Sequence, residues 1–164
     1  MLLRVVLFRW ETGSRLIETI RNFVQLTPDI GTAGQPSSEQ FQLISQAGYE
    51  VVINLAMPEH PDSISNEGEL VTKAGMSHYH IPVPFDNPDA SHVLEFCRLM
   101  QSLEGRKVFI HCIMNYRVSA FMFHYLHKLK GYSEDAAKSP MFDLWQVEPQ
   151  WADILELSAD DIGL

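Results

Sequence analysis

Short apolar runs alternate along the chain with longer segments in which apolar residues recur at helical spacing. Three runs rich in β-branched and aromatic residues predict buried strands, at 51–55, 78–83 and 108–110. The glycine-rich stretch 30–36 predicts a strand followed by a tight turn. Segments that end at glycines predict helices, at 38–47, at 67–73, from Ser91 to Gly105 and from Arg117 to Gly131. This alternation predicts an α/β fold with a mainly parallel central sheet of about four to five strands, flanked by helices.

The two ends of the chain are expected to differ. Residues 1–13 are predicted to be a strand-like or loosely docked arm, and 14–157 to be the core of a single domain spanning 1–164. Ser14 is expected to cap a helix that extends to Val24 and ends before Pro28. Further on, Ser133 is expected to cap another helix, and Pro140 to break it. Trp145 and Trp151 are expected to pack against the core.

Composition restricts the class of protein. The 164 residues are 46% hydrophobic, which suits one globular domain. The net charge of −9 argues against a nucleic-acid partner. Two cysteines cannot form a disulfide framework, so we expect a reducing compartment, the cytoplasm. We expect no signal peptide in the first ten residues, which Arg4 and Arg9 interrupt, and no membrane partner, because no stretch approaches about 20 apolar residues.

Residues 107–129 bring one cysteine and one arginine to the junction between a predicted strand and a predicted helix. In parallel α/β sheets ligands bind beyond the carboxyl ends of strands, where backbone N–H groups and a helix N-terminus attract anions. The same field favours the thiolate of Cys112, which makes it a nucleophile. Arg117 can hold a tetrahedral oxyanion with two parallel hydrogen bonds. The junction is therefore a predicted anion site with a reactive cysteine.

Other cysteine and histidine positions favour packing over chemistry. Cys97 lies on the apolar face of its predicted helix, which indicates core packing; a reversible disulfide with Cys112 is the alternative. His124 and His127 are three residues apart on a predicted helix, but no nearby cysteine or carboxylate completes a metal-ligand spacing. We therefore expect a packed or exposed histidine pair and no metal site.

The segments around the junction resemble known enzymes. His111-Cys112 with Arg117 and Ser119 resembles the phosphate-binding loop of the cysteine-dependent protein tyrosine and dual-specificity phosphatases. A wider pattern resembles the nonclassical bacterial phosphatase-like family that is often described as beta-lactamase-hydrolase-like. It covers roughly residues 20–155 and consists of 34–37, 47–55, 80–83 and 111–121. The resemblance implies a cysteine-dependent phosphatase of phosphomonoesters, phosphotyrosine among them, with no metal and no cofactor.

The resemblance also implies roles for individual residues. Cys112 would form a phosphocysteine, and Ser119 would steady its thiolate and help it leave. The phosphoryl oxygens would be held by Arg117 and by the backbone amides of Ile113, Met114, Asn115, Tyr116, Arg117 and Val118. His111 would orient the loop from beneath. The expected partner is a phosphorylated small molecule or a phosphoprotein, and inorganic phosphate or sulfate can occupy the same site.

A general acid is expected on a loop before the nucleophile strand. Asp86 fits that place best. Asp89 is the second candidate, although it can instead serve near the N-terminus of the following helix. Asp62 is a more distant third.

The cysteine–arginine spacing departs from the phosphatase pattern. Four residues separate Cys112 from Arg117, whereas the phosphatases have five. If Ser119 keeps its register, Val118 stands where the arginine should be. Asn115 replaces a glycine, and we predict that it adopts a left-handed conformation.

This spacing leaves two alternative functions open. A four-residue gap also resembles rhodanese-type sulfurtransferases, which would carry a persulfide on Cys112. A phosphate- or phosphoprotein-binding module with little turnover is the other alternative.

Overall fold

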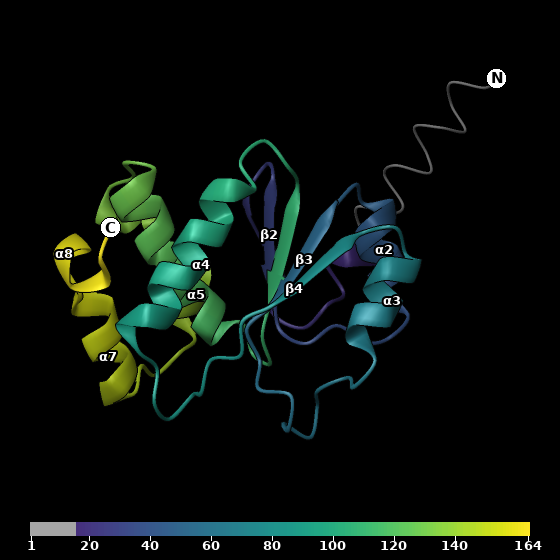
Figure 1. The fold of residues 1–164 in the computed structure, drawn as a ribbon, viewed down its shortest axis with the longest axis horizontal. Coiled ribbons are helices and arrows are strands. Elements are labelled where there is room, and N and C mark those ends of the chain that lie inside the picture. Colours follow the sequence, from purple (N-terminus) through teal and green to yellow (C-terminus); the bar gives the residue numbers. More distant parts are fainter. Residues whose placement is uncertain (1–15) are drawn as a thin grey trace.

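A five-stranded sheet forms the middle layer of the fold (Figure 1). The computed structural model describes residues 16–164, so the arm expected at 1–13 and the cap expected at Ser14 lie outside the described residues. The strands are β1 (Val24–Thr27), β2 (Ile30–Ala33), β3 (Val51–Asn54), β4 (Ser77–His80) and β5 (Val108–His111). Their order is β1-β2-β5-β3-β4, with only β1 antiparallel to its neighbour. The predicted fold class is confirmed.

The central strand β5 leads directly to the cysteine. Its residues are all buried, as expected of a strand with parallel neighbours on both sides. Its last residue, His111, pairs with Ala33 of β2 and with Asn54 of β3. The carboxyl ends of three strands therefore meet at one edge of the sheet, and Cys112 follows at this edge.

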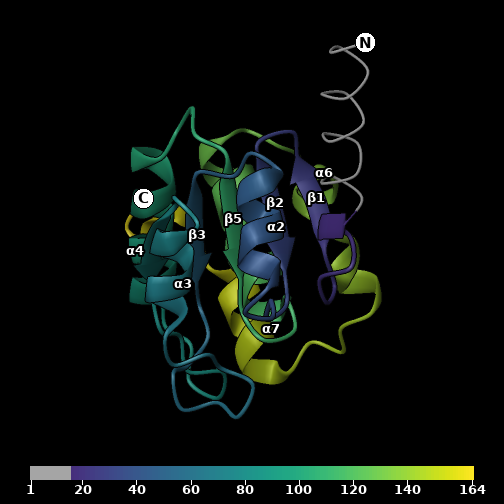
Figure 2. The same cartoon turned by 90° about the vertical axis from the view of Figure 1, so that its right-hand side faces the viewer.

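Helices cover both faces of the sheet. The helices α2 (Gln40–Gln46) and α3 (Glu67–Lys73) lie side by side on one face, as Figure 2 shows. The other face carries α4 (Ala90–Ser102), α5 (Tyr116–His124), α7 (Pro149–Glu156) and α8 (Ala159–Ile162). Since successive strand residues point to opposite faces, Val108 and Ile110 join the core beneath α4 and α5, whereas Phe109 joins the core beneath α2.

The helix predicted from Ser14 to Val24 is wrong in its second half. Turns follow Ile17, Asn22 has a φ of 51°, and Val24 begins β1. Ile17 and Ile20 are buried, as the apolar pattern requires. However, the pattern also fits turns followed by an edge strand, and the strand gains hydrogen bonds to β2. The Thr27-Pro28 pair accordingly ends a strand and not a helix.

The other helices begin and end near the predicted residues. Helix α3 spans the predicted range, and all four glycines expected to stop helices have a positive φ. The helix predicted from Arg117 to Gly131 is α5 followed by a π-helical turn, η1 (Tyr125–Leu129). Short helices α6 (Glu134–Ala137) and η2 (Pro140–Asp143) follow, capped by Ser133 and Ser139. In residues 16–164 no helix has the length and apolar character needed to cross a bilayer.

Candidate active site

Cys112 lies between β5 and α5 and contributes to the wall of a cleft of about 610 Å³. Its backbone N–H donates to the carbonyl of Ala33, which continues the β2–β5 pairing by one residue. The cleft is also lined by Met57, Glu59, His60, Pro84, Phe85, Asp86, Asn87, Ile113, Met114, Tyr116, Arg117 and Glu148. The predicted nucleophile, the predicted arginine and the preferred general acid therefore share one cleft.

The backbone carbonyls of the loop after Cys112 accept hydrogen bonds from residues outside the loop. Four successive carbonyl groups, those of residues 112–115, each accept a hydrogen bond. The donors are His111 Nδ1 to Cys112 (3.2 Å), the N–H of Gln35 to Ile113 (3.0 Å), Asn22 Nδ2 to Met114 (3.0 Å) and Ser119 Oγ to Asn115 (2.6 Å). His111 and Ser119 flank the loop, whereas Gln35 and Asn22 are remote in the sequence, so the loop conformation depends on the N-terminal part of the fold as well as on its own flanks.

These bonds orient the N–H groups of the loop. In a planar trans peptide the N–H points away from the C=O, so the N–H groups of residues 113–116 point opposite to their four bound carbonyls. Within residues 16–164, none of the N–H groups of residues 113–118 donates a hydrogen bond. Free N–H groups at the start of α5 form a site suited to an oxyanion.

Asn115 has a φ of 71°, which confirms the predicted left-handed conformation. Its side chain is fully buried and donates to the carbonyl of Asn22 and to Thr32 Oγ1, at 2.9 and 3.1 Å. Glycine would adopt the same φ but would make neither bond. At this position asparagine therefore supplies the turn and also ties the loop to the β1–β2 region.

Arg117 lies in the first turn of α5 with 5% of its surface exposed. Its Nη1 donates to the carbonyl of Val83 at 2.8 Å, and its guanidinium lies 5.6 Å from the centre of the Phe85 ring. Its buried Nε has no partner among the described residues. Val118 is fully buried in the core, so the four-residue gap leaves the arginine and not the valine at the cleft.

The loop that carries Asp86 is anchored by the last third of the chain. The Phe85 carbonyl accepts from Trp151 Nε1 at 2.9 Å, and the two rings lie 5.4 Å apart. Asp86 itself is exposed at the cleft. Asp89 instead caps α4, where it accepts from the Ser91 N–H; hydrogen bonds from the side chain and then the backbone of Ser91 lower the pKa of its carboxyl.

Several other residues that were considered for the site make contacts with the rest of the fold. Asp62 does not itself line the cleft: its carboxylate pairs with Arg21 at 3.1 Å, and its backbone N–H donates to Nδ1 of His60, which does line it. The Ser119 hydroxyl donates to the Asn115 carbonyl, so its contact with the thiolate stays a prediction. Cys97 is fully buried on α4, where burial raises its pKa to about 12, and both cysteines are free.

The two histidines of the α5–η1 segment, expected to be packed or exposed, differ: His124 is fully buried and His127 is half-buried. His124 Nε2 lies 2.8 Å from the Ile154 carbonyl, and burial lowers its pKa to about 4. His127 Nδ1 lies 2.7 Å from the Tyr132 carbonyl. Among residues 16–164 no group of three histidine, cysteine or carboxylate side chains is arranged to hold a metal ion.

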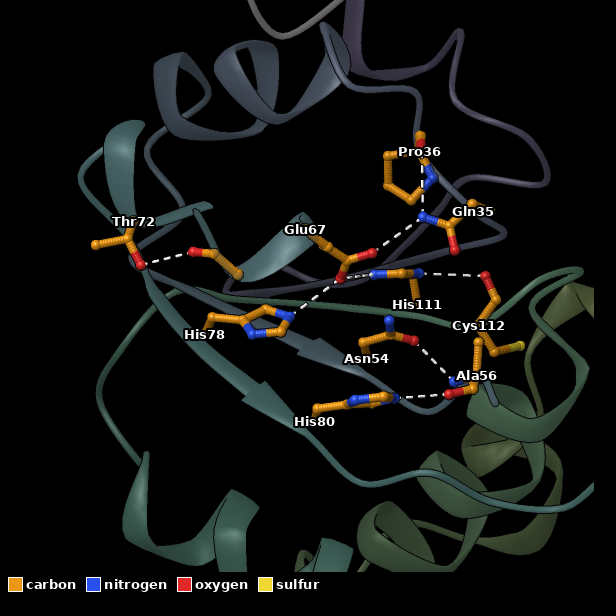
Figure 3. A network of polar contacts seen from close by, with 11 residues as sticks. Gln35, Pro36, Asn54, Ala56, Glu67, Thr72, His78, His80, His111 and Cys112 are labelled. Carbon is orange, nitrogen blue, oxygen red and sulfur yellow. Dashed lines mark hydrogen bonds and ion pairs between the residues drawn. The ribbon is translucent and has the colours of Figure 1, made fainter. Parts of the chain in front are cut away.

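Glu67 is a residue of the site that sequence reasoning missed. It is only 3% exposed, and its carboxylate contacts His111, His78 and Gln35 (Figure 3). Burial acts to raise its pKa, but the attraction of His111 and the three hydrogen bonds outweigh burial and hold the pKa well below the usual range. A glutamate in the first turn of a helix commonly complements the helix dipole, so nothing local distinguishes it.

Comparison with known proteins identifies the family. Residues 30–127 match a family model described as "Polymorphic toxin system, DSP-PTPase phosphatase". The chain belongs to this family. This protein is therefore a cysteine-dependent phosphatase of the dual-specificity and tyrosine type. The resemblance drawn from the sequence is confirmed. No curated protein matches the chain.

Solved structures of similar proteins agree with the family. A DUF442 protein from Shewanella putrefaciens CN-32 is 35% identical with a TM-score of 0.79, covering 88% of this phosphatase and 96% of that chain. TpbA of P. aeruginosa is 17% identical with a TM-score of 0.68, covering 87% and 88%. The core catalytic domain of SIW14 from S. cerevisiae is 16% identical, also at 0.68, covering 88% and 90%. At such identities the last two show the shared fold alone.

Proposed function

We propose that this phosphatase hydrolyses aryl phosphomonoesters, phosphotyrosine among them, through a cysteinyl-phosphate intermediate. The observation that carries the proposal is the junction of Cys112, the free N–H groups of the following loop and the Arg117 guanidinium at one cleft. A tetrahedral phosphoryl group bound there would present its phosphorus to the sulfur. TpbA, which shares the fold, has been crystallised in complex with phosphotyrosine.

The reaction then proceeds in two displacements. The Cys112 thiolate attacks phosphorus, the bond to the ester oxygen breaks, and Asp86 gives its proton to the departing alcohol or phenol. In the second step a water molecule attacks the phosphocysteine and gives a proton to the Asp86 carboxylate, and the thiolate leaves. In both steps the N–H groups of the loop and the Arg117 guanidinium stabilise the equatorial oxygens.

The walls of the cleft favour an aromatic ester. Met57, Phe85 and Tyr116 supply apolar surface against which a ring can pack. Glu59, Asp86 and Glu148 also line the cleft, and among the lining residues within 16–164 Arg117 is the only lysine or arginine. These carboxylates would repel a substrate that carries several further phosphates and so weaken its binding.

A substrate comparison tests the proposed function. We expect release of phosphate from a small aryl phosphate at slightly acidic pH, slower release from an alkyl phosphate of similar size, and slowest release from an inositol polyphosphate. Faster release from the polyphosphate would contradict the aryl preference. If reduced protein releases no phosphate, then transfer of sulfur from thiosulfate would favour the sulfurtransferase alternative, and binding of phosphate alone would favour the binding module.

Asp86→Asn is expected to lower kcat by about a hundredfold on an aryl phosphate with a basic leaving group, because the proton donor is lost. A general acid makes kcat decline at high pH, so this decline should disappear in the variant as well. The effect should be smaller for a nitrophenyl ester, whose leaving group needs no proton. These quantities are measured as pH profiles of kcat for both esters.

Asp89→Asn is the matched control for that experiment. It removes a carboxylate three residues away that caps α4; because asparagine also caps helices, we expect little change in the melting temperature and an unchanged difference between the two esters. The opposite pattern would assign the acid to Asp89. If neither variant changes the difference, Glu59 or Glu148 of the same cleft must supply the proton.

A further inference from the structure

One buried carboxylate lies behind the anion loop and joins three side chains (Figure 3). Glu67 Oε1 lies 2.8 Å from His111 Nε2 and 3.1 Å from His78 Nε2. Its Oε2 accepts from Gln35 Nε2 at 3.1 Å. These partners come from β5, from β4 and from the loop after β2, so Glu67 connects three segments beneath the cleft.

The hydrogen-bond partners of His111 determine which of its ring nitrogens carry hydrogens. Its Nδ1 faces the Cys112 carbonyl at 3.2 Å, and a carbonyl can only accept, so Nδ1 must carry a hydrogen. Its Nε2 faces the Glu67 carboxylate, which also accepts. With Glu67 ionised, both ring nitrogens of His111 carry hydrogens and the ring is an imidazolium. Its positive charge is fully buried, one residue before the nucleophile.

Glu67 also reaches the loop by a second route. Gln35, whose side chain binds Glu67, donates its backbone N–H to the Ile113 carbonyl at 3.0 Å. His111 holds the preceding carbonyl, that of Cys112. Two of the four carbonyl bonds that orient the loop therefore come from residues bound to the same carboxylate.

We propose that Glu67 is a positioning residue of the phosphatase, which keeps His111 doubly protonated and so stabilises the Cys112 thiolate while fixing the loop. Its expected effect on turnover rests on the function proposed above. The charge on His111 attracts the thiolate, and Glu67 compensates that charge in the buried interior. Glu67 touches neither substrate nor phosphorus, so its action passes through His111 and Gln35.

Within the part of the chain that the structure describes, few other ionisable groups surround this pair. The ionisable groups within hydrogen-bond reach of Glu67 are His111 and His78, and its third partner, Gln35, is neutral. The rings of Phe41 and Phe109 pack on His111, at 6.3 and 6.5 Å between ring centres. His78, with a side chain that is 19% exposed, connects the pair to solvent, and its ring lies 6.4 Å from that of His80.

Glu67→Gln tests the proposal through the reactivity of the thiol. We would measure the rate of alkylation by iodoacetamide against pH, without substrate. Loss of the carboxylate leaves His111 neutral, so the thiolate loses a positive neighbour and the midpoint of the profile should rise by about one pH unit. Turnover on the acidic side should fall by about tenfold in parallel. Cys97 does not interfere, because burial raises its pKa to about 12.

Glu69→Gln is the matched control. It makes the same change two residues away on α3, where Glu69 is exposed and pairs with Lys73. We expect wild-type alkylation and turnover. A merely structural role of Glu67 would lower the melting temperature of Glu67→Gln without moving the midpoint, and that result would overturn the proposal.

His111→Gln keeps the inference testable if Glu67→Gln does not fold. It removes the charge directly and should raise the midpoint by a similar amount, whereas an unchanged midpoint would overturn the inference. Adding Glu67→Gln to His111→Gln should produce no further shift, because Glu67 acts through His111. Alkylation requires no phosphate release, so failure of the proposed function and failure of this inference would be seen separately.

Discussion

Cys112→Ser is expected to abolish phosphate release, by at least about a thousandfold, while phosphate or vanadate still binds. A serine hydroxyl is much less acidic than a thiol, so the variant lacks the anionic nucleophile. The hydrogen bonds that orient the loop use backbone carbonyls and not the sulfur, so the anion site should persist. Phosphate release and anion binding by calorimetry measure the two effects.

The intermediate can be sought in the same experiment. Acid quenching of wild-type enzyme during turnover should trap protein that is heavier by one phosphoryl group, and Cys112→Ser should show none. Cys97→Ser is the control, because that side chain packs in the core on α4 and should leave turnover unchanged apart from a lower melting temperature. Activity of Cys112→Ser within about tenfold of wild type would disprove the nucleophile assignment.

Arg117→Lys is expected to lower kcat/KM by about a hundredfold to a thousandfold, the range for losing one donor to a developing oxyanion. The planar guanidinium donates Nη1 to the Val83 carbonyl and still has Nε and Nη2 for the phosphoryl oxygens. A lysine ammonium is a compact point charge, so it cannot donate to the Val83 carbonyl and to the phosphoryl oxygens at the same time in a fixed geometry. Steady-state kinetics on an aryl phosphate measure the change.

Arg106→Lys is the control for that change. Arg106 is partly exposed near the start of β5 and pairs with Glu50 at 3.7 Å, so we expect wild-type kinetics. If Arg117→Lys kept full activity but melted at a lower temperature, Arg117 would serve only to tie Val83 to α5. The assignment of the oxyanion donor would then fail.

Sequence reasoning was most accurate where a segment is buried on both sides. The strand Val108–His111 has neighbours on each edge and helices on each face, so every residue is apolar or internally bonded and the run is distinctive. The edge strand Val24–Thr27 is only half-buried and shares its apolar spacing with a helix. Its type depends on pairing with β2, which the local pattern does not contain.

The residues of the site also divide into those that a local requirement marks in the sequence and those that only tertiary contacts mark. Asn115 was predictable because a conformational requirement acts on one residue and few residue types meet it. Glu67 was not, since its importance comes from contacts with β4, β5 and the loop after β2. The sequence favoured Asp86 over Asp89 as the general acid, and in the structure Asp86 lines the cleft whereas Asp89 caps α4.

The bond from Trp151 to Phe85 has a consequence for the order of events during synthesis. The sheet, the cysteine loop and α5 all lie before residue 125, so they can form while later residues are still being added. The loop that carries Asp86 obtains its anchor from a residue 66 positions further along. Until the segment around Trp151 has left the ribosome, this loop lacks that anchor. On the mechanism proposed above, the proton donor would therefore be the last part of the site to be fixed in place.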